Sequence, residues 1–287
     1  MDTADLLKKV RKIEIKTKGL SQQIFSGAYL SHFKGRGMAF SEVREYYYGD
    51  DVRAIDWNVT ARFDRPYIKV FEEEREMTVI LLIDVSASNI FGTKKCFKQD
   101  LITEIAAVLS FSAIQNNDKV GVIFFSDQVE KYIPPKKGRS HILRIIRELL
   151  TLEPVDKQTS IGNALQFLNN VIKKRATTFI LSDFFDINYQ DALKIVRKKH
   201  DLIALQICDQ REQRLPNIGL LHIMDLETKQ ERWIDTSLTS NREAYRQQWL
   251  SHEADIGTLF RKFAIRSVKI QTDEDYVKPL IRVFQSK

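Results

Sequence analysis

The sequence predicts an α/β fold, namely a doubly wound, mostly parallel sheet of the Rossmann type flanked by helices. Short apolar runs rich in β-branched residues alternate along the chain with segments whose apolar residues recur at helical spacing. The runs are apolar without interruption, which is typical of strands buried on both faces of a parallel sheet. Because parallel strands are joined by crossover helices, we expect helices on both faces of the sheet.

The N-terminal part of the chain follows a different pattern. Apolar residues between positions 6 and 15 predict an amphipathic helix that extends to about residue 18. Glycine and proline residues then interrupt any long periodicity: Gly27, Gly35, Gly37, Gly49 and Pro66. We therefore expect residues 1–76 to form an N-terminal helix and an irregular appendage, and residues 77–287 to form the sheet-and-helix domain.

Strands and helices alternate from residue 77 onward. Strands are predicted at residues 78–85, which form an unbroken apolar run, and at residues 119–125, 177–181, 202–207 and 267–270. The predicted helices carry apolar residues at helical spacing around residues 101–113, 142–150, 161–172 and 192–196. A weaker hairpin around residues 220–234 precedes a long helix, and a final helix is expected to open at Thr272.

Composition limits the class of protein. The chain has 287 residues, 43% of them hydrophobic and 29% charged, which is enough to bury one substantial core. Its apolar runs are far shorter than the roughly 20 residues that cross a bilayer, and its first residues lack the basic region of a signal peptide. Cys96 and Cys208 lie far apart without metal-ligand spacing, which fits core thiols in a reducing compartment. We expect a cytoplasmic protein without direct membrane insertion.

The net charge of +7 raises the question of a nucleic-acid partner, because clustered basic residues bind phosphates. Here the basic residues are dispersed along the chain. The densest stretch, at residues 8–18, is typical of the solvated face of a helix. We therefore expect no nucleic-acid partner.

Polar residues follow the predicted strands at the edge where open parallel sheets bind ligands. Asp84, Ser86 and Ser88 come directly after the first strand, Thr159 begins the third helix, and Asp183 follows the strand that ends near residue 182. Carboxylate and hydroxyl oxygens suit Mg²⁺ or Mn²⁺, which prefer octahedral oxygen ligands and retain waters or accept an outside carboxylate. These residues predict a metal site with open positions that an acidic residue of a partner can fill.

A structural interpretation competes with the metal site. Ser88, Thr159 and Ser160 suit helix caps, and for Ser160 alone that interpretation is favoured. Asp183 is less suited to capping, because Asp186 lies nearer to the next helix. The conjunction of the Asp-x-Ser-x-Ser loop with a threonine and a second aspartate at matching strand ends favours the metal site.

Two further segments carry a resemblance to a known family. They are Gly35-Arg-Gly-Met-Ala-Phe-Ser-Glu-Val-Arg-Glu45 and Gly49-Asp-Asp-Val-Arg-Ala-Ile-Asp-Trp-Asn-Val-Thr-Ala-Arg62. Together with the polar residues above, they resemble the bacterial domain-of-unknown-function 58 family across residues 26–186. The resemblance implies a von Willebrand factor A-like domain behind a short N-terminal region. It also implies a MoxR-type AAA+ ATPase, or that ATPase's client, as the partner.

The same resemblance places the pattern of a metal ion-dependent adhesion site on Asp84, Ser86, Ser88, Thr159 and Asp183. This chain departs from the family pattern at two positions. Asn89 stands where many relatives have methionine, and Ser160 stands where they have aspartate. Because the second change removes a carboxylate, we expect weak metal binding.

The segment from Asp50 to Arg62 has two interpretations. In the functional one, Trp57 is an aromatic anchor of a docking surface. In the favoured structural one, its charged residues pair with one another and tie the appendage to the sheet domain.

The sequence argues against an enzyme. Its five histidines are scattered, and it contains no nucleophile elbow, phosphate-binding loop or dinucleotide-binding glycine motif. The strongest enzymatic alternative is a magnesium-dependent phosphohydrolase of haloacid dehalogenase type with Asp84 as nucleophile. Such enzymes use a second aspartate two residues later as the general acid, where this chain has Ser86. We expect a non-enzymatic protein–protein interaction module, with a scaffold whose metal site is vestigial as a further alternative.

Overall fold

The structure, a computed structural model, divides the chain into two compact units. Met1–His32 together with Thr78–Lys287 form one, here called the sheet unit, and Phe33–Met77 form the other, here called the small unit. The residues that the structure describes are 8, 10–14, 17, 39–63, 65–72, 77–90, 97–152, 158–186, 188–224 and 231–285.

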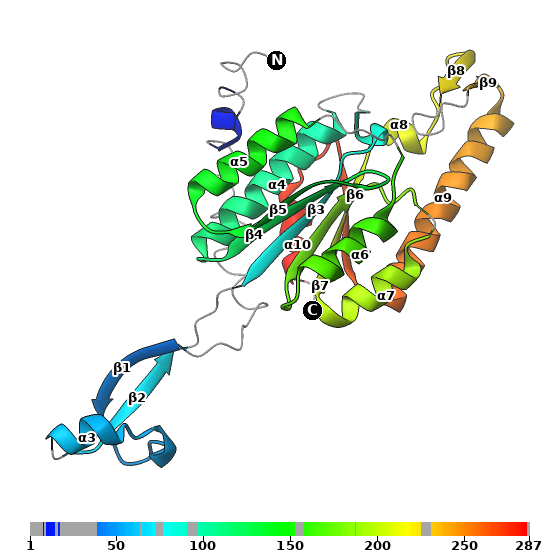
Figure 1. Ribbon diagram of the computed structural model, residues 1–287. Helices are drawn as coiled ribbons and strands as arrows, with labels where there is room; N and C mark the ends of the chain where they lie inside the picture. Colours follow the sequence, from blue (N-terminus) through cyan, green and yellow to red (C-terminus); the bar gives the residue numbers. More distant parts are fainter. Residues whose placement is uncertain are drawn as a thin grey trace. The chain divides into compact units, whose positions relative to one another are not determined.

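A six-stranded sheet forms the centre of the sheet unit (Figure 1). Its strands are β3 (Thr78–Asp84), β4 (Lys119–Phe125), β5 (Val129–Lys136), β6 (Thr177–Ser182), β7 (Asp201–Cys208) and β10 (Arg266–Gln271). They lie in the order β10-β7-β6-β3-β4-β5, and all neighbours are parallel except β4 and β5. This is the doubly wound order, in which the direction of winding reverses between β3 and β6. The predicted fold class is confirmed.

Helices cover both faces of this sheet. They are α4 (Lys98–Gln115), α5 (Arg139–Thr151), α6 (Ile161–Val171), α7 (Gln190–Lys199), α9 (Thr239–Lys262) and α10 (Val277–Gln285). One core cluster joins Ile80, Leu82 and Ile180 of the sheet to apolar residues of α6, α7 and α9. Because successive strand residues point to opposite faces, Phe179 instead contacts Phe284 of α10, with ring centroids 5.8 Å apart. None of the described helices has both the length and the apolar character that crossing a bilayer requires.

Most predicted elements of the sheet unit occur near their predicted bounds, and two differences have a physical cause. The strand β5 is not among the predicted strands, because it contains Pro134 and Pro135, which remove hydrogen-bond donors. They are tolerated here because β5 is an antiparallel edge strand. The final helix begins at Val277 rather than at Thr272, because Thr272 lies in a turn and its hydroxyl donates to Asp209 at 2.6 Å. The expected hairpin is present as β8 (Leu220–Met224) and β9 (Glu231–Asp235).

One glycine in the sheet is required by close packing. A Cβ atom on Gly121 of β4 would lie 3.0 Å from Ile80 and 3.0 Å from Pro135 of the edge strand. Pro135 of β5 therefore approaches β4 at a place where β4 has no side chain. Of the two cysteines, Cys208 is a buried free thiol as expected, and Cys96 lies outside the described residues.

The described residues near the N-terminus pack on the sheet unit. Val10 belongs to an apolar cluster with Phe111 of α4 and Ile146 of α5, and Glu14 accepts a 2.5 Å hydrogen bond from Arg139. An amphipathic helix needs an apolar surface to cover its buried stripe, and α4 and α5 provide one. The predicted boundary places residues 1–76 together. The structure instead groups Met1–His32 with the sheet unit and leaves only Phe33–Met77 in the small unit.

The small unit is more regular than the predicted appendage. Strands β1 (Ala39–Glu45) and β2 (Tyr67–Glu72) pair antiparallel, and the connection between them contains a 3-10 turn, η1 (Val52–Ala54), and α3 (Trp57–Phe63). The expectation of an irregular region is wrong for residues 39–72. A strand pair interrupted by a 21-residue connection has no compact sequence signature, because neither a short turn nor a long periodicity marks it.

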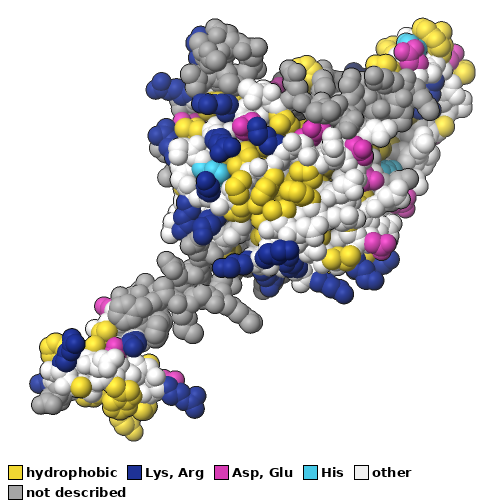
Figure 2. Space-filling model, in the orientation of Figure 1, with side chains coloured by type: hydrophobic (Ala, Val, Ile, Leu, Met, Phe, Trp, Pro, Cys, Tyr) yellow, Lys and Arg dark blue, Asp and Glu magenta, His cyan; other side chains and the backbone are white. Residues whose placement is uncertain are grey.

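Charged residues of the small unit pair within it, although not with the partners expected. Asp50 accepts two hydrogen bonds from Arg44, at 2.8 and 2.9 Å, and this pairing holds the pKa of Asp50 below its ordinary value. Asp56 lies 3.3 Å from Lys69 of β2. The Trp57 side chain is 66% exposed, and Figure 2 shows hydrophobic side chains gathered on the surface of this unit. A docking role for Trp57, the less favoured of the two interpretations, is not tested by these contacts.

The buried side chain of His200 makes stability dependent on pH. Its Nδ1 atom accepts a 3.2 Å hydrogen bond from the Ala176 amide, which only the neutral ring can do. Burial, assisted by the charge of Lys199, lowers the pKa of His200 to about 4. Because the unfolded chain binds this proton more readily, the stabilisation is complete above pH 6.5 and is lost as pH falls toward 4, by on the order of 3 kcal/mol.

We therefore predict that the free energy of unfolding decreases between pH 6.5 and 4 less steeply in His200→Asn than in the wild type. The asparagine oxygen can replace Nδ1 as the acceptor without titrating. Urea denaturation at a series of pH values measures the difference, and His222→Asn, at an exposed histidine of β8, is the control. Equal slopes for the wild type and His200→Asn would contradict the assignment.

Candidate metal site

The candidate site lies at the carboxyl ends of β3 and β6, where the strand order reverses. Ile83 is in register with Leu181, so Asp84 and Ser182 leave the sheet side by side. The Ser182 hydroxyl donates a 2.6 Å hydrogen bond to the Asp84 carboxylate. Crevices at such reversal points are where open α/β sheets bind ligands, because the adjacent loops turn to opposite faces.

Asp84 is a carboxylate buried at the end of β3, with only 1% of its surface exposed. Besides the Ser182 hydroxyl, it accepts a 2.9 Å hydrogen bond from the Ser86 amide. Burial, together with the negative charge of Asp183, raises the pKa of Asp84 to about 6. The hydrogen bonds to Asp84 thus offset its charge only in part, and a cation nearby would stabilise the ionised form.

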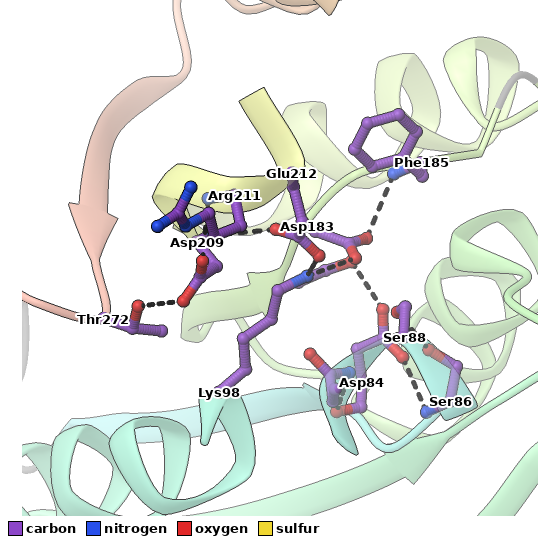
Figure 3. A network of polar contacts seen from close by, with 12 residues as sticks. Asp84, Ser86, Ser88, Lys98, Asp183, Phe185, Asp209, Arg211, Glu212 and Thr272 are labelled. Atoms are coloured by element: carbon purple, nitrogen blue, oxygen red, sulfur yellow. Dashed lines mark hydrogen bonds and ion pairs between the residues drawn. The ribbon is translucent and has the colours of Figure 1, made fainter. Parts of the chain in front are cut away.

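Ser86 and Ser88 place two hydroxyl oxygens beside this carboxylate (Figure 3). Their Oγ atoms lie 3.0 Å apart. Ser88 lies within a short 3-10 turn, η2 (Ala87–Ile90), and the residue that precedes α4 is Phe97, so Ser88 does not cap that helix. The Asn89 side chain donates to the backbone carbonyl of Asp84 at 2.9 Å and fixes the loop.

Thr159 lies at the same edge, in the loop that leads into α6. Ser160 is the N-cap of α6, because its hydroxyl accepts from the Asn163 amide at 3.4 Å. This confirms the capping interpretation of Ser160. The Ser160 amide also donates to the Ser126 carbonyl at 2.8 Å, so the loop that carries Thr159 is tied to the end of β4, the neighbour of β3.

Asp183 follows β6 and is also buried, but its charge is already paired. Its Oδ1 atom accepts a 3.2 Å hydrogen bond from the Phe185 amide, and its Oδ2 atom lies 3.0 Å from the ammonium group of Lys98. Phe184, between them, has a φ of +64°, and its amide donates to the Ser182 hydroxyl at 3.0 Å. The chain therefore turns sharply after β6 and directs Asp183 towards Lys98.

Sequence reasoning did not identify Lys98, the first residue of α4. Its side chain is completely buried, and its ammonium group forms a second ion pair with Glu212 of α8 (Gln210–Gln213). The pattern does contain a sign of this role. Lys98 lies three and four residues before Leu101 and Ile102, in phase with the buried stripe of the helix, where a lysine is unusual.

Glu212 is held in place by the end of the sheet. One of its oxygens accepts from the Asp209 amide at 2.9 Å in a capping box, and Asp209 accepts from the Thr272 hydroxyl after β10. Burial alone would lower the pKa of Lys98, but the charges of Asp183 and Glu212 outweigh it and raise that pKa. Burial raises the pKa of Glu212, and Lys98 opposes the shift.

These residues fit a divalent cation that is held weakly. The donors near Asp84 are all hard oxygen atoms, as Mg²⁺ and Mn²⁺ prefer. Among the residues that the structure describes, no three His, Cys, Asp or Glu side chains are placed to hold one metal ion. A cation here would therefore depend on hydroxyl oxygens and water as well as on Asp84, because Asp183 is shared with Lys98.

The loop after Asp183 adjoins an aromatic group and a pocket. The Phe185 ring stacks on His252 of α9, with centroids 4.3 Å apart and planes 19° apart. A pocket of about 450 Å³ is lined by residues of this loop and of α7 and α9, including Asp186, Tyr189, His252, Asp255 and Lys262. The candidate site thus continues into a surface with both polar and apolar groups.

The fold and the loop after β3 together define a von Willebrand factor A-like α/β protein. That loop carries an Asp-x-Ser-x-Ser sequence directly after the first strand of a doubly wound sheet. The chain belongs to the family described as "Protein of unknown function DUF58", which matches residues 42–255. The family predicted from the sequence is therefore confirmed.

Individual proteins are also similar to this chain. The chain is 28% identical over 292 residues to the uncharacterized protein Rv1480 of Mycobacterium tuberculosis, covering 100% of this chain and 91% of that one. Its fold is similar to that of an aerotolerance-related membrane protein from Bacteroides fragilis, with a TM-score of 0.50, 14% identity, and coverage of 72% and 98% of the two chains. The VWA domain of SpRpn10 matches with a TM-score of 0.39, 12% identity, and coverage of 74% and 98%.

Proposed function

We propose that this protein is a non-enzymatic interaction module that binds Mg²⁺ or Mn²⁺ at the carboxyl edge of its sheet and uses the cation to bind an acidic residue of a partner. The observation that carries this proposal is the buried Asp84 beside the paired hydroxyls of Ser86 and Ser88. A cation at this place would supply positive charge and open coordination positions.

The division of roles follows from the surroundings of each residue. Ser86 and Ser88 present adjacent neutral oxygens, and Asp84 supplies negative charge directly or through water. Thr159 is expected to complete the shell from the α6 side, and Asp183 contributes charge that is already reduced by Lys98. Because few charged ligands remain, a carboxylate from outside would add substantially to the binding of the cation.

The partner is proposed from the family resemblance. A MoxR-type AAA+ ATPase, or the client on which it acts, would supply the acidic residue, and ATP turnover would belong to that ATPase. The proposed role is assembly or chaperone-like activation of the client, in the cytoplasm. The pocket beside Phe185 offers polar and apolar contacts for the segment that carries the acidic residue.

The surroundings of Asp84 favour binding over phosphohydrolase chemistry. A phosphohydrolase of haloacid dehalogenase type needs a proton donor two residues after its nucleophile. Ser86 is buried at that position with its hydroxyl oxygen 3.0 Å from that of Ser88, and a serine hydroxyl does not supply a proton at neutral pH. The interaction module is therefore the better assignment.

We predict saturable binding of Mg²⁺ and Mn²⁺ to the metal-free wild type by isothermal titration calorimetry. In Asp84→Asn the affinity is expected to fall at least tenfold, which corresponds to about 1.4 kcal/mol, because the variant loses the charge and keeps the shape. Asp186→Asn is the matched control, since Asp186 lies on the β6 loop and caps backbone amides instead. Equal affinities for the wild type and Asp84→Asn would contradict the assignment of Asp84.

We also predict that capture of a MoxR-type ATPase, or of its client, requires the divalent cation. Retention of the purified partner on immobilised wild-type protein should be lost in EDTA, restored by Mg²⁺, and absent in Asp84→Asn. Retention that is unaffected by either EDTA or Asp84→Asn would support the scaffold with a vestigial metal site.

A further inference from the structure

Lys98 places a positive charge inside the sheet unit beside the candidate site. None of its surface is exposed, and its ammonium group lies between Asp183 after β6 and Glu212 of α8 (Figure 3). The two carboxylates come from different elements, and α4 contributes the lysine. One ammonium group therefore joins three segments at the carboxyl edge of the sheet.

This position is unfavourable for a lysine unless nearby negative charges compensate its ammonium group. Burying an ammonium ion is strongly unfavourable before pairing, and the N-terminal turn of a helix repels a cation through its dipole. Both costs apply to Lys98, which is the first residue of the 18-residue helix α4. An apolar side chain would fill the same place with less desolvation, so packing alone does not account for a lysine.

The charge has a definite effect on the neighbouring site. Asp84, Asp183 and Glu212 carry three negative charges when ionised, and Lys98 compensates one of them. The ammonium group contacts Asp183, the carboxylate that would otherwise share a cation with Asp84. Any divalent cation bound at Asp84 is therefore repelled by Lys98 and attracted less by Asp183.

We propose that Lys98 is a built-in counter-cation that keeps the affinity of the Asp84 site for divalent cations low, and that Glu212 sets how strongly Lys98 is held on Asp183. The proposal rests on the proposed metal site. It makes α8 a control point, because movement of Glu212 towards or away from Lys98 changes the charge available at Asp183. A partner that contacts α8 would thereby change the affinity for the metal.

Two substitutions should change metal affinity in opposite directions. Lys98→Met keeps the length of the side chain and removes the positive charge, so Asp183 becomes available to a cation. Glu212→Gln removes the competing carboxylate, so Lys98 is held on Asp183 alone. A purely structural role for the ion pairs would instead make both variants bind metal less well, because both disturb the same buried contacts.

The experiment is a titration of Mn²⁺ alone into the metal-free proteins. We expect Lys98→Met to bind at least tenfold more tightly than the wild type, and Glu212→Gln to bind several-fold more weakly. Lys131→Met is the charge control, because Lys131 pairs with Glu148 at 2.6 Å on β5 and α5, and its affinity should equal that of the wild type. Unchanged or weaker binding by Lys98→Met, with binding intact in the wild type, overturns the proposal and leaves the proposed function standing.

A second measurement covers loss of stability in Lys98→Met, which leaves two buried carboxylates unpaired. Thermal unfolding with and without Mn²⁺ should show a larger metal-induced rise in Tm for Lys98→Met than for the wild type. The double variant Lys98→Met with Glu212→Gln removes the extra buried charge and should keep the tight binding. Binding by Lys98→Met but not by the wild type would show that Lys98 suppresses the site completely and would support both the metal site and the role of Lys98, and binding by neither would refute both.

Discussion

Mutual repulsion between two buried carboxylates is the constraint on which the carboxyl edge of this sheet depends. The reversal of strand order between β3 and β6 places Asp84 and Asp183 at neighbouring strand ends, out of contact with water. Two negative charges buried so close together require compensating partners. Serine hydroxyls and backbone amides offset part of the charge of Asp84, and an ion pair offsets that of Asp183. The segments around the two carboxylates therefore supply different compensating groups, which are hydroxyls and amides for Asp84 and an ammonium group for Asp183.

The compensation of Asp183 extends through the sheet unit. Lys98 orients the start of α4, and Glu212 joins it to α8, whose capping box involves Asp209. Asp209 in turn accepts from Thr272 after β10. Because every link is largely buried and directional, we expect a change at either end of this series to alter how strongly Lys98 compensates the charge of Asp183. The positions of these side chains and the compensation of the Asp183 charge therefore depend on each other.

The sequence was sufficient for the parts of the fold that depend on burial. Strands such as β3 and β4 are continuous apolar runs because both of their faces are covered, and their bounds could be predicted within a residue. The strand β5 could not, because Pro134 conceals a strand that only the edge position permits. The small unit was missed for a different reason, since β1 and β2 pair across a connection that itself contains α3.

The candidate site likewise contains residues that the sequence could predict and residues that it could not. Asp84, Ser86 and Ser88 lie in one short stretch of sequence and Asp183 follows a clear strand, so their arrangement follows from topology. The involvement of Lys98 and Glu212 depends on contacts across 85 residues and on the depth of burial, which composition and periodicity do not report. Only the helical phase of Lys98 indicated that the lysine points inward.

Two independent features reduce the negative charge available to a cation. Ser160, at the position where the family resemblance implies an aspartate, serves as the N-cap of α6, and Lys98 occupies one oxygen of Asp183. A site of this kind gains more from an outside carboxylate than a site already rich in acids would, because the incoming charge meets less repulsion. Weak intrinsic metal binding and strong dependence on an acidic partner would therefore be two consequences of the same charge distribution. On this argument, the cation would be held firmly only when the partner is present, which makes binding of the metal and binding of the partner mutually dependent.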